Sequence, residues 1–184
     1  MRPRDLLLVI DMQNVYREGG TWACRGTDAA AERILAAIRS DAFHRVLFTR
    51  FLASDRPKGV WRDYNTLYAD VIHDPDANRL MEPFRSLPDC SPIYTKHVYS
   101  ALHIPEVRAA AEQADRVAVT GVVAECCVLS TVFSLIDLGK PVLWLTDCIA
   151  GIDRAREQAV QTVLTDLIPL HIRPMTLDDY LSEA

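Results

Sequence analysis

Uninterrupted apolar runs, each followed by a segment with helical spacing, limit this chain to very few folds. The first run, Leu6–Ile10 (LLLVI), contains no polar residue, so the strand that it forms must be buried on both faces. Strands of this kind belong to parallel sheets that helices cover on both sides. Five later strands are expected at Arg45–Thr49, Ile93–Lys96, Val117–Thr120, Val142–Thr146 and Leu170–Ile172. The sequence therefore predicts a doubly wound, Rossmann-like α/β fold with a six-stranded parallel sheet and helices on both faces.

Helical segments are expected between these strands. They are Ala29–Arg39, Glu106–Gln113, the segment from Cys127 to Gly139, Arg154–Asp166 and Leu177–Leu181. Thr27 and Asp28 are candidate N-caps for the first of them. The stretch from Leu52 to Cys90 is different, because four prolines and several polar clusters interrupt it. Long connections in a compact domain are usually functional loops or lids, so a lid is one interpretation of this stretch.

Composition restricts what the protein does. With 184 residues and 49% hydrophobic content, residues 1–184 are expected to form a single domain. No apolar run is long enough to cross a bilayer, and the N-terminal MRPRD does not begin a signal peptide, so a cytoplasmic protein without a membrane partner is expected. The net charge of -5, without a basic run, argues against a nucleic-acid partner. Five cysteines without a CxxC pair indicate reduced thiols.

A pair of cysteines stands where a helix is expected to begin. Cys126 and Cys127 follow the strand that ends at Gly121, and the apolar residues after them have helical spacing. A thiol in the first helical turn is close to the positive end of the macrodipole and to unpaired amides, which favour thiolate and lower its pKa. A nucleophile is one interpretation, and a pair of ordinary buried cysteines is an equally good one from this segment alone.

Two charged residues also follow predicted strands. Asp11 comes directly after Leu6–Ile10, and Lys96 ends the run Ile93–Lys96. Considered one at a time, the aspartate is best interpreted as the cap of a helix or turn, and the lysine as a solvated strand end. In open parallel sheets, however, sites form in the crevice outside the carboxyl ends of the strands. An acid, an ammonium and a thiol are therefore expected in one crevice, which favours catalysis.

Three segments around these residues resemble those of the isochorismatase-like cysteine hydrolases. The superfamily includes nicotinamidases, N-carbamoylsarcosine amidohydrolases, ureidoacrylate amidohydrolases and isochorismatases. The resembling segments are LLLVIDMQNVY (residues 6–16), KHVYSAL (96–102) and VTGVVAECCVLST (119–131). The resemblance implies an Asp11, Lys96 and Cys127 triad, and it also implies a homo-oligomer that acts on a small-molecule substrate.

The same resemblance separates the two cysteines. The family's Cys-Val pattern corresponds to Cys127 and Val128, which leaves Cys126 as a packing residue. Helical geometry agrees, since Cys127 shares a face with the polar residues at positions 130, 131 and 134. The resemblance further implies a cis peptide between Val122 and Val123, with the amides of Val123 and Cys127 forming an oxyanion hole.

Neither a metal nor an organic cofactor is expected. No GxGxxG or GxxxxGK[ST] motif follows a strand, so the phosphate cradles of nucleotide-binding folds are missing. Zinc-dependent nicotinamidases carry an Asp-x-His pair after the second strand, where this chain reads TRFLAS (Thr49–Ser54). His73, with Asp70 and Asp74 beside it, reads better as a solvated turn than as a metal site.

Four residues are candidates for substrate binding. Tyr16 corresponds to an aromatic pocket residue of the family, and Trp61 and Tyr64 lie in the long connection expected to cover the strand ends. Arg50 could hold a substrate carboxylate in a bidentate fork, although a structural ion pair is favoured for it. Asp147 is expected to order neighbouring loops and to take no part in chemistry.

The function predicted from these observations is metal-free hydrolysis of a C–N bond in a small amide, carbamoyl or ureido compound. Asp11 takes the proton of Cys127, Lys96 favours the thiolate, and the thiolate forms a thioester-type covalent intermediate. Two alternatives remain open. One is an isochorismatase-type vinyl-ether hydrolase, which does not need the thiol, and the other is a non-catalytic α/β binding protein.

Overall fold

Six strands form one all-parallel sheet in a computed structural model that describes residues 3–87 and 91–183. The strands are β1 (Leu6–Ile10), β2 (Arg45–Phe51), β3 (Ile93–Lys96), β4 (Val117–Gly121), β5 (Val142–Ile149) and β6 (Ile172–Met175). Their order across the sheet is β3-β2-β1-β4-β5-β6, and each pairs with its neighbours in parallel. This arrangement confirms the predicted doubly wound α/β fold.

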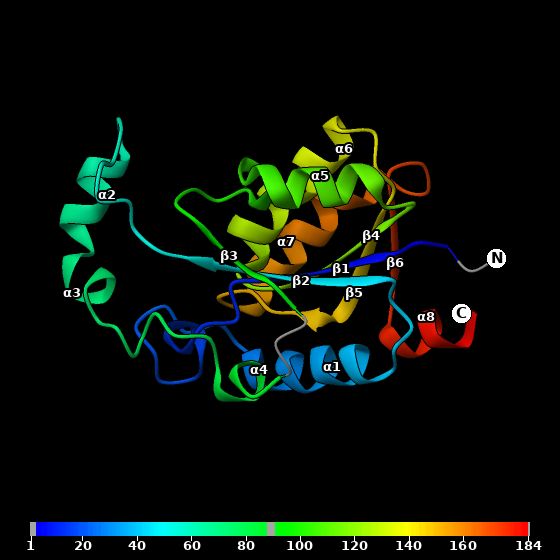
Figure 1. Ribbon diagram of the computed structural model, residues 1–184, viewed down its shortest axis with the longest axis horizontal. Coiled ribbons are helices and arrows are strands. Elements are labelled where there is room, and N and C mark those ends of the chain that lie inside the picture. Colours follow the sequence, from blue (N-terminus) through cyan, green and yellow to red (C-terminus); the bar gives the residue numbers. More distant parts are fainter. Residues whose placement is uncertain (1–2, 88–90, 184) are drawn as a thin grey trace.

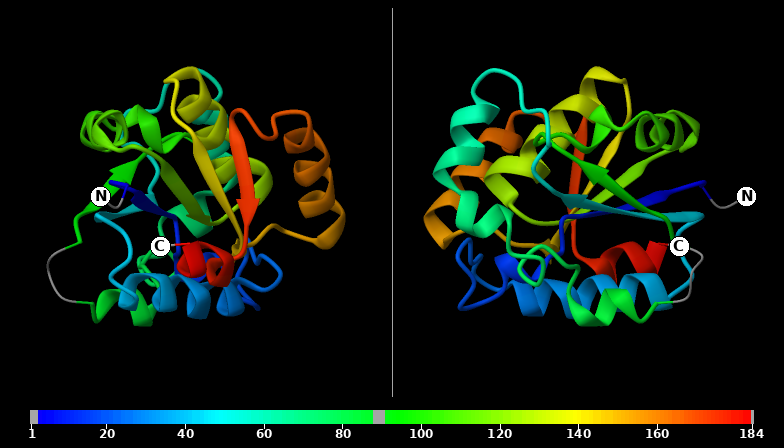
Figure 2. Two further views of the ribbon diagram at one scale, coloured as in Figure 1. Left: turned by 90° about the vertical axis from the view of Figure 1, so that its right-hand side faces the viewer. Right: turned by 60° about the vertical axis from the view of Figure 1, so that its left-hand side comes forward.

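Helices cover both faces of the sheet. On one face lie α1 (Thr27–Arg39), α4 (Glu82–Arg85) and α8 (Leu177–Glu183), and on the other lie α5 (Pro105–Gln113), α6 (Leu129–Asp137) and α7 (Arg154–Thr165) (Figure 1). Figure 2 shows the same layers from the side, with α1 in blue and α6 in yellow separated by the strands. Among the described residues no helix is long and apolar enough to cross a membrane.

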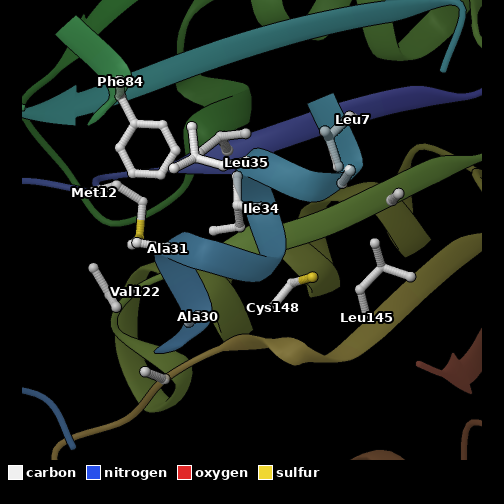
Figure 3. Packing of buried hydrophobic residues seen from close by; sticks show 14 of the residues in the cluster. Leu7, Met12, Ala30, Ala31, Ile34, Leu35, Phe84, Val122, Leu145 and Cys148 are labelled. Atoms are coloured by element: carbon white, nitrogen blue, oxygen red, sulfur yellow. The ribbon is translucent and has the colours of Figure 1, made fainter. Parts of the chain in front are cut away.

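Each strand divides its side chains between two cores, because successive residues of a strand point to opposite faces. In β1, Leu7 and Val9 join the core beneath α1, whereas Leu6, Leu8 and Ile10 join the core beneath α5, α6 and α7. Figure 3 shows the first core, where Ile34 and Leu35 of α1 pack near Leu7. The whole of β1 is buried, as its uninterrupted apolar sequence predicts.

Several element boundaries differ from those predicted, among them the start of the last strand and the start of the first helix. The last strand is Ile172–Met175, and the expected strand residue Leu170 is 84% exposed in the turn before it. Helix α1 begins one residue after Gly26, which takes a left-handed conformation as N-cap. Thr27 therefore lies inside the helix, where its hydroxyl donates hydrogen bonds to the carbonyl oxygens of Tyr16 and Cys24. The predicted caps Thr27 and Asp28 are wrong.

The connection after β2 contains more regular structure than the sequence indicates. Helices α2 (Trp61–Leu67) and α3 (Ala69–Ile72) stand beyond the carboxyl ends of the strands, and α4 follows them (Figure 1). Asn78 fastens the end of α3, because its side chain donates to the carbonyl oxygens of Val71, Ile72 and Asp74. The end of the connection, including Cys90, lies outside the described residues.

Candidate active site

The central strands β1 and β4 place Asp11 and Cys127 on either side of the point where strand order reverses. Chain connections run outward in opposite directions from these two strands, which opens a crevice at their carboxyl ends. Gly121 ends β4 opposite Ile10, with φ at 102°, and a Cβ on it would clash with the Ile10 carbonyl. Glycine at this position therefore permits the close approach of the two strands beside the crevice.

Asp11 is fully buried at the end of β1. Its Oδ1 accepts a hydrogen bond of 2.8 Å from the hydroxyl of Thr49, and its amide donates to the Thr49 carbonyl at 3.1 Å. The backbone of Asp11 has a positive φ of 52°. Thr49 was not singled out by the sequence, because an isolated threonine in a strand gives no signal of such a role.

Lys96 joins the other two residues of the predicted triad. Its Nζ lies 2.6 Å from Asp11 Oδ2 in an ion pair that is not aligned as a hydrogen bond, and both side chains are fully buried. The same ammonium donates to Cys127 Sγ at 3.2 Å and to the Val98 carbonyl at 3.1 Å. The carboxylate, the ammonium and the thiol therefore form one connected group, although they come from three separate strand ends.

The electrostatics of this group differ from the sequence expectation. Burial, followed by the charge of Asp11, raises the pKa of the Cys127 thiol well above its ordinary value, and Lys96 only partly offsets the rise. Burial lowers the pKa of Lys96, but its interactions with Asp11 and Cys127 more than compensate, so that this pKa is raised. The direction is therefore opposite to the lowered thiol pKa expected from the helix start, because burial and the neighbouring carboxylate both favour the neutral form of Cys127.

The chain around Cys127 is also less regular than expected. Residues Ala124–Val128 form a π-helical turn before α6, in which the amides of Cys126 and Val128 both donate to the Val123 carbonyl. The peptide bond between Val122 and Val123 is cis, as the family resemblance implied. Within the described part of the chain, the amide of Val123 donates no hydrogen bond.

Hydrogen bonds from the polar face of α6 connect the segment after Lys96 to the segment that contains Cys127. Thr131 donates to the Cys127 carbonyl at 2.7 Å and accepts from the Ala101 amide at 3.0 Å. One turn later, Ser134 accepts a hydrogen bond of 2.8 Å from Ser100. These bonds fix the chain that follows Lys96 against the helix that follows Cys127. They therefore help to keep the side chains of Lys96 and Cys127 in contact.

A cavity of about 290 Å³ opens beside Cys127. Val123, Cys126 and Cys127 line it, and many of the other lining residues are aromatic. The six aromatic residues of the wall are Tyr16, Trp22, Phe51, Tyr64, Tyr68 and Tyr99. Asp11 and Lys96 lie outside this lining, so Cys127 is the residue of the group that the cavity reaches.

The sequence identified part of this wall. Tyr16 and Tyr64 line the cavity, whereas Trp61 does not and packs instead against Phe51 and Tyr99. Phe51, Trp22, Tyr68 and Tyr99 were missed. Tyr99 lies within the recognised lysine segment and could have been found there, but Trp22 lies in a short connection without any recognisable pattern.

Two further expectations require correction. Arg50 does not reach the cavity: it is exposed on β2 and donates to Thr95 on the neighbouring strand at 2.9 Å, and no carboxylate pairs with it among the described residues. Side chains alternate along a strand, so Arg50 points away from the buried face of Thr49 and Phe51. Cys126 is not a simple packing residue, because it is partly exposed and lines the cavity. Asp147 orders loops as expected, pairing with Arg33 at 2.7 Å.

The residues present do not fit a zinc site. Arg50 and the apolar side chains of Phe51 and Leu52 occupy the end of β2, where a zinc-binding relative would need nitrogen or carboxylate ligands. Across residues 3–87 and 91–183, no three His, Cys, Asp or Glu side chains are grouped closely enough to hold a metal ion. The group around His73 is thereby excluded as a ligand cluster.

Comparisons with known proteins identify the family and the fold. A family model described as the isochorismatase domain matches residues 5–176. A cysteine hydrolase from Pseudomonas syringae pv. phaseolicola has a similar structure, with a TM-score of 0.80 at 22% identity, over 97% of this chain and 91% of that one. No curated protein matches the sequence significantly.

Two further solved structures share the fold. An isochorismatase-like hydrolase from Alkaliphilus metalliredigens gives a TM-score of 0.79 at 17% identity, covering 100% of this chain and 99% of that one. A pyrazinamidase of Pyrococcus horikoshii, solved in complex with zinc, gives 0.72 at 18% identity, covering 95% of this chain and 100% of that one. At these identities the structural likenesses support the fold alone.

Proposed function

The chain belongs to the isochorismatase family of hydrolases, and from this premise we propose that it is a cysteine hydrolase of small amide, carbamoyl or ureido compounds. One observation carries the proposal. The buried ammonium of Lys96 contacts both Asp11 and the Cys127 thiol, at 2.6 and 3.2 Å, next to a cavity that reaches the sulfur. A nucleophile, a proton acceptor and a fixed positive charge are the groups that covalent amide hydrolysis requires.

In the proposed reaction, Asp11 accepts the proton of Cys127 as Sγ attacks the substrate carbonyl carbon. The amides of Val123 and Cys127 receive the negative charge that develops on the carbonyl oxygen. The C–N bond then breaks, and Asp11 returns the proton to the leaving nitrogen, so that ammonia or an amine departs from a thioester. Water attacks the thioester with Asp11 as its base, which releases the acid and restores the thiol.

The electrostatics of the site support this order of events. Burial and the charge of Asp11 raise the pKa of Cys127, which favours a neutral thiol before the proton is transferred. When the proton moves to Asp11, the negative charge moves to sulfur and the total charge of the buried group does not change. Lys96 contacts both atoms that carry this charge, so the transfer requires no new desolvated charge.

A purely structural role for this group is less well supported. Removing a lysine and an aspartate from water costs several kcal/mol per ion, and buried pairs of this kind seldom add net stability. Strongly perturbed titratable groups beside a cavity are instead typical of functional sites.

The test is a panel of simple carboxamides, N-carbamoyl amino acids and ureido acids, assayed by ammonia release. We expect at least one substrate, and we expect Cys127→Ala to reduce its turnover about ten-thousand-fold or more. Cys126→Ala is the matched control and should retain most activity, because Lys96 donates to the sulfur of Cys127. Cleavage of a vinyl ether that survives Cys127→Ala, with no ammonia from the panel, would contradict the proposal.

We propose that the reaction needs no metal. Protein freed of purification metals should hold no stoichiometric zinc or iron by elemental analysis, and ammonia release should survive chelators. About one transition metal per chain, together with chelator-sensitive turnover, would refute this part of the proposal.

A further inference from the structure

Trp22 connects the aromatic residues that enclose the cavity. Its ring lies 6.0 Å from that of Tyr16, 6.2 Å from that of Tyr64 and 5.5 Å, edge to face, from that of Tyr68. Tyr64 and Tyr68 also contact each other, with 4.7 Å between their ring centroids. Trp22 thus joins the loop before α1 to α2 and to the residue after it, two parts of the chain that lie far apart in the sequence.

No charged side chain completes this wall. Among the described residues that line the cavity there is no Asp, Glu, Lys, Arg or His. Lys96 does not line the cavity, and its ammonium already contacts Asp11, Cys127 and the Val98 carbonyl. Arg50, the candidate for carboxylate binding, is held outside by Thr95. A carboxylate that entered would lose its water without gaining a cationic partner, which is costly.

We propose that this wall restricts the enzyme to amides whose acyl part is uncharged and flat, and that Trp22 is the residue that determines the preference for flat groups. The inference rests on the proposed function and narrows it, because it excludes the N-carbamoyl amino acids and ureido acids that carry a carboxylate. Flat groups are favoured since aromatic rings stack or meet edge to face on such walls, which contributes about 0.5 to 1.5 kcal/mol per pair beyond burial.

Charge selectivity is tested by binding to the Cys127→Ala protein, so that turnover does not enter the measurement. The probes are 4-acetylbenzamide and 4-carboxybenzamide, which match in size and shape and differ in charge. Calorimetry should give a dissociation constant at least about tenfold higher for the anion, since an unpaired buried charge is penalised by more than the 1.4 kcal/mol that tenfold represents.

The role of Trp22 is tested with benzamide and cyclohexanecarboxamide, which are similar in size but differ in flatness. The Cys127→Ala protein should bind benzamide more tightly than cyclohexanecarboxamide, and adding Trp22→Leu to it should reduce this preference by about 2- to 10-fold. Trp61→Leu is the matched control, because Trp61 contacts Tyr64 at 5.2 Å but does not line the cavity. The Trp61→Leu change should leave the preference for benzamide over cyclohexanecarboxamide unaltered.

The outcomes separate the two proposals. Tighter or equal binding of the anion, tighter binding of a cationic analogue, or no binding of either 4-substituted amide at millimolar concentration would overturn the charge selectivity. An unchanged preference in Trp22→Leu, or an equal loss in Trp61→Leu, would overturn the assignment of Trp22. Cys127-dependent ammonia release from N-carbamoyl amino acids but not from neutral amides would overturn the inference while leaving the cysteine hydrolase intact.

Discussion

At the scale of single residues, burial raises the pKa of Cys127, the charge of Asp11 raises it further, and Lys96 partly offsets both. The positions of these residues could be predicted, because each follows a recognisable strand and the carboxyl ends of parallel strands meet at one edge. The protonation state could not be predicted. It depends on complete burial and on the distances of 2.6 and 3.2 Å around Nζ, which are tertiary properties that no local pattern encodes.

The pH dependence of alkylation checks this electrostatic account. Because the pKa of Cys127 is raised, its alkylation by iodoacetamide should still increase above the pH of about 8.5 at which a free thiol is half ionised. Lys96→Met removes the charge that opposes the rise, so alkylation at a given pH should slow, about tenfold for each pKa unit. Peptide mapping by mass spectrometry follows Cys127 separately from Cys126.

Asp11→Asn should separate alkylation from turnover. Loss of the negative charge lowers the pKa of Cys127, so its alkylation near pH 8 should become faster. Ammonia release should nevertheless fall about 100- to 10,000-fold, because the general base is gone. If alkylation and turnover fell together, Asp11 would be needed to form the thiolate even in the resting protein.

Gln13 is a second buried residue whose role emerges only from the fold. Its amide donates to the carbonyls of Phe51 and Asn78, and its Oε1 accepts from the Phe51 amide at 2.7 Å. We expect Gln13→Ala to lower the free energy of unfolding by about 2 kcal/mol or more, since buried backbone groups lose their partners. The side chain of the half-buried neighbour Asn14 makes one hydrogen bond within the described residues, to the Asp76 carbonyl, so Asn14→Ala should cost under about 1 kcal/mol in the same urea titration.

At the scale of elements, the hydrophobic pattern was sufficient to predict the helices and strands that are buried. It was insufficient to predict those that are exposed. The run of β1 identified its strand to the residue, because every side chain in it contacts a core. Helix α2 was missed because it buries no residue and therefore has no apolar stripe to recognise. The error at β6 has a related cause, since Leu170 is apolar yet lies exposed in a turn.

The close approach of β1 and β4 predicts that Gly121 tolerates no side chain. Gly121→Ala combines a positive φ with a clash against Ile10, and should lower the free energy of unfolding by about 3 kcal/mol or more. Gly139, at the end of α6, also has a positive φ but has open space around its Cα. Gly139→Ala should therefore cost only about 1 to 2 kcal/mol, and equal losses in thermal or urea unfolding would contradict the argument.

At the scale of the whole molecule, topology explains why chemistry gathers at one end. Alternating strands and helices predict a parallel sheet, and the observed order reverses between β1 and β4, beside Asp11 and Cys127. The aromatic wall could not be foreseen in full, because Trp22 and Tyr68 come from two connections that meet only in the folded chain. Homo-oligomerisation remains a prediction, which light scattering of the purified protein would test.

Detection of the covalent intermediate tests the central claim most directly. A substrate that releases ammonia is mixed with enzyme, and the reaction is stopped with acid during turnover. The mass of the intact protein is then measured by mass spectrometry. The account predicts an increase equal to the acyl group, mapped to the peptide of Cys127 and removed by hydroxylamine as a thioester would be. Continued turnover with no adduct on Cys127, or an adduct that persists in Cys127→Ala, would contradict it.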